Sequence, residues 1–274
     1  MILIVASNTD MASLNIRKQI LSNYNFNEKQ QQYKSNPTYE VTIANRNIEL
    51  ITLGSESIYA QDLPNSFTNL ELIIFISKHS SLSGRPTLSV HTPGNLAEAE
   101  MGGISRKVST SPPNAMREAL RTMTKLKAEL KLNYQVSYEG THHGPSLDVP
   151  TMFTELGSSP KEWEDTMAAE AVAHATMNAA QHFDGQLAKA VLGIGGPHYN
   201  EKFTRIALEK ELAFGHIIPK YAVPKIDENV LEQCIKKTSE KVEAIILDWK
   251  GIKAEDKPSL MDIITKTKVP YLKT

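Results

Sequence analysis

The stretch Glu71-Leu-Ile-Ile-Phe-Ile-Ser77 holds five consecutive apolar residues. A continuous apolar run of this kind is typical of a strand that is buried on both faces of a sheet. The first residues, Met1-Ile-Leu-Ile-Val-Ala-Ser7, have the same character. Outward from these two runs, short β-rich segments alternate with longer helical patterns. This alternation predicts a single α/β domain over residues 1–274, with a mixed, mostly parallel sheet flanked by helices.

The other elements follow from hydrophobic periodicity and turn residues. We expect further strands over 39–44, 48–53, 88–91, 134–138, 149–156, 190–194, 213–218 and 244–247. We expect helices over 10–22, 114–131, 160–183, 199–212, 228–237 and 258–266. The polar stretch 23–36, which holds three consecutive glutamines, is expected to be a loop or a variable insertion.

The composition excludes several classes of protein. Thirty basic residues against 31 acidic ones exclude a uniformly basic coat for nucleic acid, although a local basic patch remains open. One cysteine, Cys234, excludes a disulfide framework and a thiolate zinc cluster. The apolar start is too short to cross a bilayer, which takes about 20 residues, and it lacks the basic region of a signal peptide. We therefore expect a soluble protein of the cytoplasm without a membrane partner.

Histidines gather at the ends of expected strands, beside glycine or proline. The positions are His91, His142, His143, His198 and His216. Ligands of open α/β sheets bind outside the carboxyl ends of the strands, so we expect these side chains to converge on one cleft. Each histidine alone could equally bond the backbone at a tight turn, but the set favours a functional site.

Imidazole and carboxylate groups together suit zinc. Glu155 and Asp148 are the nearest acidic candidates, and no HExxH motif is present. The glycines of Gly193-Ile-Gly-Gly-Pro-His198 follow a strand and precede a helix. Their backbone N–H groups could face an anion, or the glycines could serve only a tight turn, and the sequence does not decide between the two.

Charge is segregated along the chain. Residues 101–137 hold seven basic side chains against two acidic ones. On the expected helix, Arg117, Arg121 and Lys125 lie in a row opposite the apolar stripe, and Arg106 and Lys107 precede it. Such a row could follow an RNA backbone, although a solvated helix face is the commoner explanation.

Five blocks of sequence resemble the archaeal and plant type of D-aminoacyl-tRNA deacylase. They are His91-Thr-Pro-Gly-Asn95, Gly140-Thr-His-His-Gly-Pro145, Phe153-Thr-Glu-Leu-Gly-Ser158, Gly195-Gly-Pro-His-Tyr199 followed by Phe203-Thr204, and Gly215-His216 with Pro219-Lys-Tyr221. The resemblance implies a cytosolic, zinc-dependent enzyme that hydrolyses the ester between a D-amino acid and tRNA. It also implies a fold similar to purine nucleoside phosphorylases and peptidyl-tRNA hydrolases.

Within that resemblance, each candidate residue takes a hypothetical role. His142, His143 or His198 would ligate zinc, with His91 and His216 as further candidates, and Glu155 would be a ligand or the general base. His143 would pair with Glu155 if no metal takes part. The backbone N–H groups of Gly195 and Gly196 would hold the developing oxyanion.

The remaining expectations concern tRNA binding, the oligomeric state and two alternative functions. The tRNA would be gripped by the basic side chains named above, DNA would not be bound, and the protein would be a monomer. Two alternatives stay open. One is a peptidyl-tRNA hydrolase-like or nucleoside phosphorylase-like enzyme, and the other is a non-catalytic tRNA-binding module whose histidines are structural.

Overall fold

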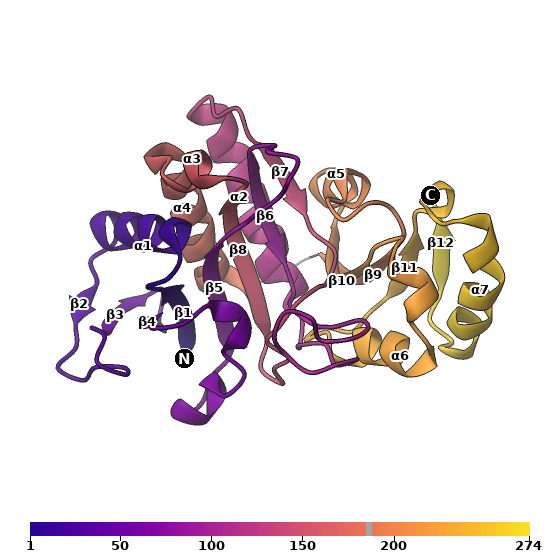
Figure 1. Ribbon diagram of the computed structural model, residues 1–274, viewed down its shortest axis with the longest axis horizontal. Coiled ribbons are helices and arrows are strands. Elements are labelled where there is room, and N and C mark those ends of the chain that lie inside the picture. Colours follow the sequence, from indigo (N-terminus) through magenta and orange to yellow (C-terminus); the bar gives the residue numbers. More distant parts are fainter. Residues whose placement is uncertain (185–187) are drawn as a thin grey trace.

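A computed structural model describes residues 1–184 and 188–274 and confirms the α/β expectation (Figure 1). Its larger sheet has eight strands in the order β2-β3-β4-β1-β5-β8-β6-β7. Their bounds are Ile2–Ser7 (β1), Asn27–Glu28 (β2), Tyr39–Ile43 (β3), Arg46–Leu53 (β4), Leu72–Lys78 (β5), Thr87–His91 (β6), Gln135–Tyr138 (β7) and Thr151–Gly157 (β8). The short strand β2 shows that the polar stretch 23–36 is not wholly irregular.

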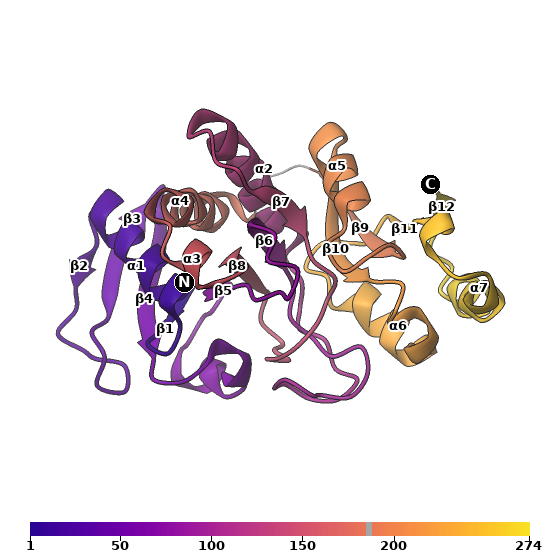
Figure 2. The same cartoon turned by 45° about the horizontal axis from the view of Figure 1, so that its top comes forward.

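A second sheet is parallel throughout, in the order β10-β9-β11-β12. Its strands are Lys189–Ile194 (β9), Leu212–Ile218 (β10), Ala244–Leu247 (β11) and Tyr271–Lys273 (β12). The two sheets lie side by side, and the C-terminus lies at the outer end of the smaller one (Figures 1 and 2). The sequence predicted most of these strands but not the division into two sheets.

The α-helices are Met11–Asn23 (α1), Pro113–Glu129 (α2), Pro160–Trp163 (α3), Thr166–His182 (α4), Glu201–Glu209 (α5), Glu228–Lys236 (α6) and Lys257–Lys266 (α7). Short 3-10 helices cover Ser57–Tyr59 (η1), Leu63–Ser66 (η2), Val223–Lys225 (η3), Trp249–Gly251 (η4) and Ala254–Asp256 (η5). The expected helix over 160–183 is divided in two. The carboxylate of Asp165 accepts hydrogen bonds from the backbone N–H groups of Met167 and Ala168, which caps a new helix there.

The two faces of the larger sheet are covered differently. Ile2, Ile4 and Ala6 of β1 belong to a buried cluster with residues of α1, α2 and α4. Leu3 and Val5 point to the other face, where they meet residues of the 3-10 segments and loops. Side chains alternate along a strand, so the continuous apolar run follows from burial on both sides. Loops, rather than α-helices, thus lie over the face that carries the candidate site.

Helix α2 connects the two sheets. It packs on α4, on β6 and β7 of the larger sheet, and on β10 of the smaller one. The helix-side cluster also contains Phe203 of α5 and Phe214 of β10, whose rings stack with centroids 4.6 Å apart. One continuous apolar cluster therefore fixes both sheets. Among the described residues, no helix is long and apolar enough to cross a membrane.

Asp10 provides the first testable feature, because three groups from two elements bond its carboxylate. It accepts hydrogen bonds from the backbone N–H groups of Ser13 (2.9 Å) and Lys78 (2.8 Å) and from the hydroxyl of Ser77 (3.1 Å). We expect Asp10→Ala to lower the free energy of unfolding by about 1–3 kcal/mol, because a helix cap, the buried Ser77 hydroxyl and the partly buried Lys78 N–H lose their partner.

Urea denaturation measures this change. Asp10→Asn keeps one carbonyl acceptor and should lose less stability than Asp10→Ala. Wild-type stability in the alanine variant would show that the carboxylate does not join α1 to the end of β5.

Candidate functional site

Three segments bring the histidines together. His91 is the last residue of β6, and His142 and His143 follow β7, which lies beside β6 in parallel. His198 follows β9 of the other sheet. The N–H of Gly140 donates to the carbonyl of His198 over 2.9 Å, so the loop after β7 is fixed directly to the loop after β9.

Four imidazole rings are in contact. The ring centroids of His142 lie 4.3 Å from His91, 4.2 Å from His143 and 4.5 Å from His198. One ligand atom from each of His91, His142 and His143 lies within 4.8 Å of the others. Two further groups meet the same limit: Glu139, His142 and His198, and His79, Glu139 and Glu155. The structure thus brings together four of the five histidines singled out from the sequence, and Glu155 with them.

Backbone carbonyls orient two of these rings. The Nδ1 atom of His142 donates to the carbonyl of Gly140 (2.8 Å), and that of His143 donates to the carbonyl of Gly144 (2.7 Å). A carbonyl only accepts, so each Nδ1 carries the proton and each Nε2 keeps a lone pair. Desolvation and the neighbouring imidazoles lower the pKa of His142 and bring that of His143 to about 4. Both rings are therefore held in the neutral form that binds metals.

His91 is the most unusual of the set. Its ring is buried and stacks on Phe153, with the centroids 5.1 Å apart. Neither ring nitrogen has a hydrogen-bond partner among the described residues, and the nearest carboxylate oxygen, on Glu155, is 3.7 Å from Nε2. Buried polar atoms nearly always have partners, so this pair of nitrogens indicates a ligand.

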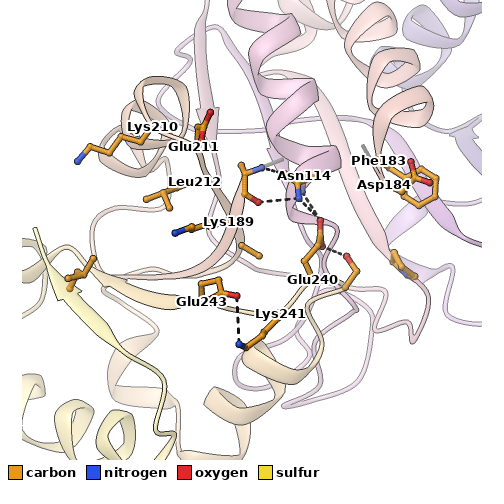
Figure 3. A pocket seen from close by; sticks show the side chains of 15 residues that line it. Asn114, Phe183, Asp184, Lys189, Lys210, Glu211, Leu212, Glu240, Lys241 and Glu243 are labelled. Atoms are coloured by element: carbon orange, nitrogen blue, oxygen red, sulfur yellow. Dashed lines mark hydrogen bonds and ion pairs between the residues drawn. The ribbon is translucent and has the colours of Figure 1, made fainter. Parts of the chain in front are cut away.

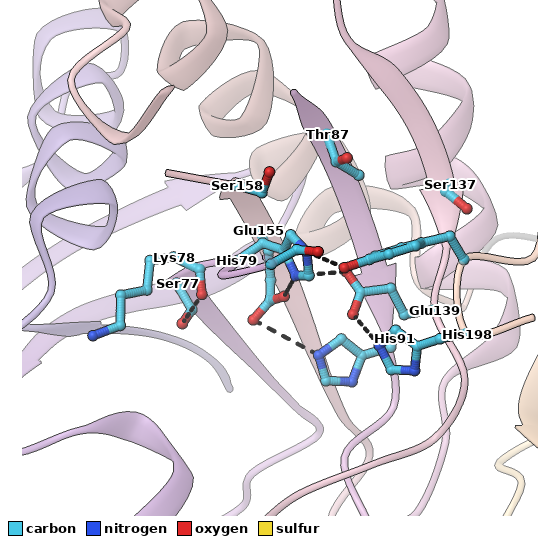
Figure 4. A network of polar contacts seen from close by, with 12 residues as sticks. Ser77, Lys78, His79, Thr87, His91, Ser137, Glu139, Glu155, Ser158 and His198 are labelled. Atoms are coloured by element: carbon cyan, nitrogen blue, oxygen red, sulfur yellow. Dashed lines mark hydrogen bonds and ion pairs between the residues drawn. The ribbon is translucent and has the colours of Figure 1, made fainter. Parts of the chain in front are cut away.

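A buried ionic network supports the cluster (Figure 4). The Glu139 carboxylate lies 3.1 Å from Nδ1 of His79 and 3.0 Å from Nε2 of His198. Nε2 of His79 bonds the hydroxyl of Tyr199 (2.6 Å), and Glu155 lies 3.5 Å from Nδ1 of His79. Burial alone would lower the pKa of His79, but the two carboxylates raise it to about 11. Burial opposes ionisation of Glu139 as well, yet His79 and His198 hold its pKa well below the usual range.

His79 and Glu139 were not among the site residues expected from the sequence. His79 stands in Lys78-His79-Ser80-Ser81, with neither glycine nor proline beside it. Glu139 directly precedes the Gly140-Thr-His-His block. A carboxylate at a strand end, so close to two histidines, could have identified it as a site residue.

His198 is held in place at both ring nitrogens. Its Nε2 donates to the Glu139 carboxylate and its Nδ1 bonds the hydroxyl of Tyr221 (3.1 Å). Among the described residues, His91, His142 and His143 are thus the set whose Nε2 atoms have no hydrogen-bond partner.

Three expected site residues have other partners. The buried ring of His216 bonds the hydroxyl of Thr141 (3.1 Å) and the carbonyl of Lys237 (3.1 Å), and it belongs to none of the three groups. The N–H of Gly195 donates to the carbonyl of Ile218 (2.8 Å), and that of Gly196 points to the carbonyl of Gly251 (3.4 Å).

These hydrogen bonds bear on the oxyanion role expected for Gly195 and Gly196 and on the zinc-ligand role expected for His216. Gly195 and Gly196 have φ values of +104° and +76°, so the geometry favours the tight-turn interpretation over an anion site. The structure does not bring the Gly195 amide or His216 into the cluster.

The expected basic row is not a continuous exposed surface. Arg117 is buried and donates to the carbonyls of Ala207 (3.1 Å) and Lys210 (3.2 Å). Arg121 and Lys125 are exposed and form ion pairs along α2 with Glu118 and Glu129, respectively.

The other basic candidates lie nearer to the histidines. Arg106 and Lys107 belong to the 94–108 loop, which is bonded to the cluster through the N–H of Gly94 and the carbonyl of His143 (2.7 Å). Lys107 forms an ion pair with Asp148, an exposed residue that belongs to none of the three metal-compatible groups.

Two pockets meet at the cluster and share Met101, His142 and His143. The first, which we call the Tyr221 pocket, has about 330 Å³ and lies between the loops 94–101 and 221–225. The second, the Glu155 pocket, has about 460 Å³ and is lined by Asp10, residues 56–58, 77–82, Glu155, His198 and Tyr199. A larger pocket of about 1080 Å³, near Asn114 and Lys189, contains none of these histidines (Figure 3).

The sequence matches one protein family over most of its length. The family model described as D-aminoacyl-tRNA deacylase covers residues 66–272. Proteins named D-aminoacyl-tRNA deacylase from Thermococcus kodakarensis and Pyrococcus abyssi are 38% and 37% identical, over 92% and 98% of both chains in each pair.

Solved structures give a second comparison. The crystal structure of a conserved protein of unknown function aligns with a TM-score of 0.87 and 30% identity, over 100% of this chain and 95% of its own. Purine nucleoside phosphorylase from Toxoplasma gondii aligns with 66% of this chain and 90% of its own, with a TM-score of 0.41 and 13% identity. The second likeness is too slight to support an argument about function.

The charge on His79 gives a testable pH dependence. Folding raises its pKa from the ordinary 6.5 to about 11, so its protonation stabilises the fold below about pH 6.5 and this contribution is lost as the pH rises toward 11. We expect His79→Gln to cost most stability at and below about pH 6.5. In metal-free protein, the difference from wild type should shrink by at most about 1.4 kcal/mol per pH unit up to about pH 10.

Urea denaturation at several pH values measures that difference. His182→Gln, on the exposed surface of α4, serves as the control and should show no such trend. A His79→Gln difference that stays constant with pH would contradict a buried imidazolium.

Proposed function

Because the chain belongs to the D-aminoacyl-tRNA deacylase family, we propose that it hydrolyses the ester between a D-amino acid and tRNA. The products are the free D-amino acid and tRNA. One observation carries the proposal most directly. The unpartnered nitrogens of His91 lie beside the neutral His142 and His143, where two pockets meet. An ester substrate needs such a junction, since its two halves extend to opposite sides of the reacting carbon.

A zinc ion fits the residues at this junction. His91, His142 and His143 would hold it, because their free nitrogens lie close together and two of the rings are fixed in the neutral tautomer. Bound zinc would polarise the ester carbonyl and lower the pKa of a coordinated water to about 7. Glu139 and Glu155 supply negative charge beside His91 and the neutral rings of His142 and His143, which suits a divalent cation.

Glu155 is the group best placed to move protons. It is buried, and His79 and His91 help to lower its pKa against the effect of burial, so it remains a carboxylate. In the proposed reaction, a water oxygen attacks the ester carbon and Glu155 accepts the proton that this water loses. The bond between the carbon and the tRNA oxygen then breaks, and Glu155 returns the proton to that oxygen. His79 and Glu139 are positioning residues that fix Glu155 and His198.

For tRNA, we propose that Arg106 and Lys107 make contacts near the site and that Arg121 and Lys125 make more distant ones. Arg117 does not join them, because its guanidinium is used inside the protein. We also propose a single-domain monomer that acts in the cytoplasm and binds neither DNA nor membranes.

Substitutions at the cluster test the reaction. We expect His142→Ala and Glu155→Gln each to lower the rate of D-tyrosyl-tRNA hydrolysis at least about 100-fold, because each removes a group that acts on the reacting atoms. Release of D-tyrosine from purified D-tyrosyl-tRNA is the measurement.

His182→Ala, an exposed histidine of α4, is the matched control and should keep the wild-type rate. Circular dichroism establishes that each variant is folded. Near-normal rates in both cluster variants would contradict the proposed site. If the wild type binds tRNA and never hydrolyses the ester, the non-catalytic alternative is correct.

A further inference from the structure

The two pockets at the histidine cluster differ in chemistry, and this difference distinguishes the two halves of the substrate. On one side of the ester carbon is the aminoacyl group, and on the other is the terminal nucleoside of tRNA. We infer that the Tyr221 pocket binds the 3′-terminal adenosine and that the Glu155 pocket takes the aminoacyl group. The inference rests on the proposed ester hydrolysis and assigns the two subsites of that reaction.

An exposed aromatic ring lies on one wall of the Tyr221 pocket. Tyr221 is 48% exposed, although large hydrophobic side chains of this chain are mostly buried. Met101, which is 54% exposed, lies where this pocket meets the Glu155 pocket and lines both. Exposed aromatic rings and soft sulfur-containing side chains are surfaces on which nucleobases stack.

Tyr221 is also held in a fixed direction. Its hydroxyl bonds Nδ1 of His198 over 3.1 Å, and His198 is bonded in turn to the buried Glu139. A ring fixed at its far end loses little freedom when a base stacks on it. The same contact joins the nucleoside subsite to the ionic network of the active site.

Basic groups lie at the edge of this pocket. Lys225 lines it and takes part in no ion pair among the described residues. Arg106, one of the proposed tRNA contacts, donates to the carbonyl of Lys225 over 3.3 Å and forms an ion pair with the exposed Asp227. Both cations are placed to meet phosphates that precede the terminal nucleoside. Two acidic residues, Glu98 and Glu100, also border the pocket and are exposed, and the carboxylate of Glu98 accepts a hydrogen bond from Ser105.

The Glu155 pocket is suited to the aminoacyl half of the substrate. Three carboxylates line it, from Asp10, Glu56 and Glu155. Two cations line it as well: Lys78 pairs with Glu56, and His79 lies 3.5 Å from Glu155. The free amino group of an aminoacyl ester carries positive charge near neutral pH, and carboxylates favour it. Ile58 and Leu82 add apolar surface for a side chain. The pocket also contains Ser57, whose buried hydroxyl has no hydrogen-bond partner among the described residues.

Kinetics with two substrates test the assignment. The D-tyrosyl and D-alanyl esters of one and the same tRNA share the terminal adenosine and differ only in the amino-acid side chain. We expect Tyr221→Ala to raise KM about tenfold for both esters, since loss of one stacked base has this order of effect. Tyr221→Phe keeps the ring and should keep KM, while kcat falls because His198 loses a hydrogen bond. Ile58→Ala should raise KM for the tyrosyl ester more than for the alanyl ester.

Tyr271→Ala is the matched control, because this tyrosine is 41% exposed on β12 and should leave KM unchanged. The inference is overturned if Tyr221→Ala leaves KM at the wild-type value, or raises it for the tyrosyl ester alone, which would place the amino-acid side chain on Tyr221. If Tyr221→Phe raises KM as much as Tyr221→Ala does, the hydroxyl of Tyr221 contacts the substrate and ring stacking does not explain the binding. If the wild-type protein hydrolyses neither ester, the proposed function itself fails.

Discussion

The candidate site depends on one buried carboxylate. Glu139 is 2% exposed and lies between His79 and His198, which come from segments on either side of it. An isolated buried charge would cost several kcal/mol, so the partners of Glu139 must be in place whenever the protein is folded. This requirement fixes His198 directly and, through the shared contact with His79, also fixes Glu155.

The same residue marks the junction of the two sheets. The N–H of Glu139 donates to the carbonyl of Val90 (3.0 Å), which holds it beside β6, and the N–H of Asn200 donates to the carbonyl of Tyr138 (2.9 Å). The loop after β7 is thereby bonded to β6 on one side and to the loop after β9 on the other. The contact between the two sheets therefore brings His198 to the site residues of the larger sheet. The loop-covered face of the larger sheet leaves space for a substrate there.

Much of the fold could be predicted because short stretches of sequence determine most of its strands and helices. The apolar runs at 2–6 and 71–77 are strands, and the gathering of histidines at strand ends correctly indicated that His91, His142, His143 and His198 meet. Glu155 reaches them for a reason that the sequence does not show. It lies in the middle of β8, and β6 runs antiparallel to β8, so Glu155 approaches His91 across the sheet face.

The failed expectations concern partners that are distant in sequence. Arg117 fits an exposed helix stripe, but its guanidinium bonds the carbonyls of Ala207 in α5 and of Lys210 directly after it, some 90 residues away. His216 has the same flanking residues as the true cluster members, yet Lys237 and Thr141 use both its nitrogens. The Gly195 amide likewise pairs with β10. Residue type and spacing identify candidates, whereas tertiary hydrogen bonds decide which side chains remain free.

The most direct test of this account is the release of amino acid from D-tyrosyl-tRNA and L-tyrosyl-tRNA, each with and without a zinc chelator. The account predicts release from the D ester alone, lost on chelation and restored by added zinc. D-selective release that survives chelation would keep the reaction and remove zinc from it, leaving Glu155 and His143 as an acid/base pair. Release from both esters alike, or from neither under any metal condition, would contradict the account.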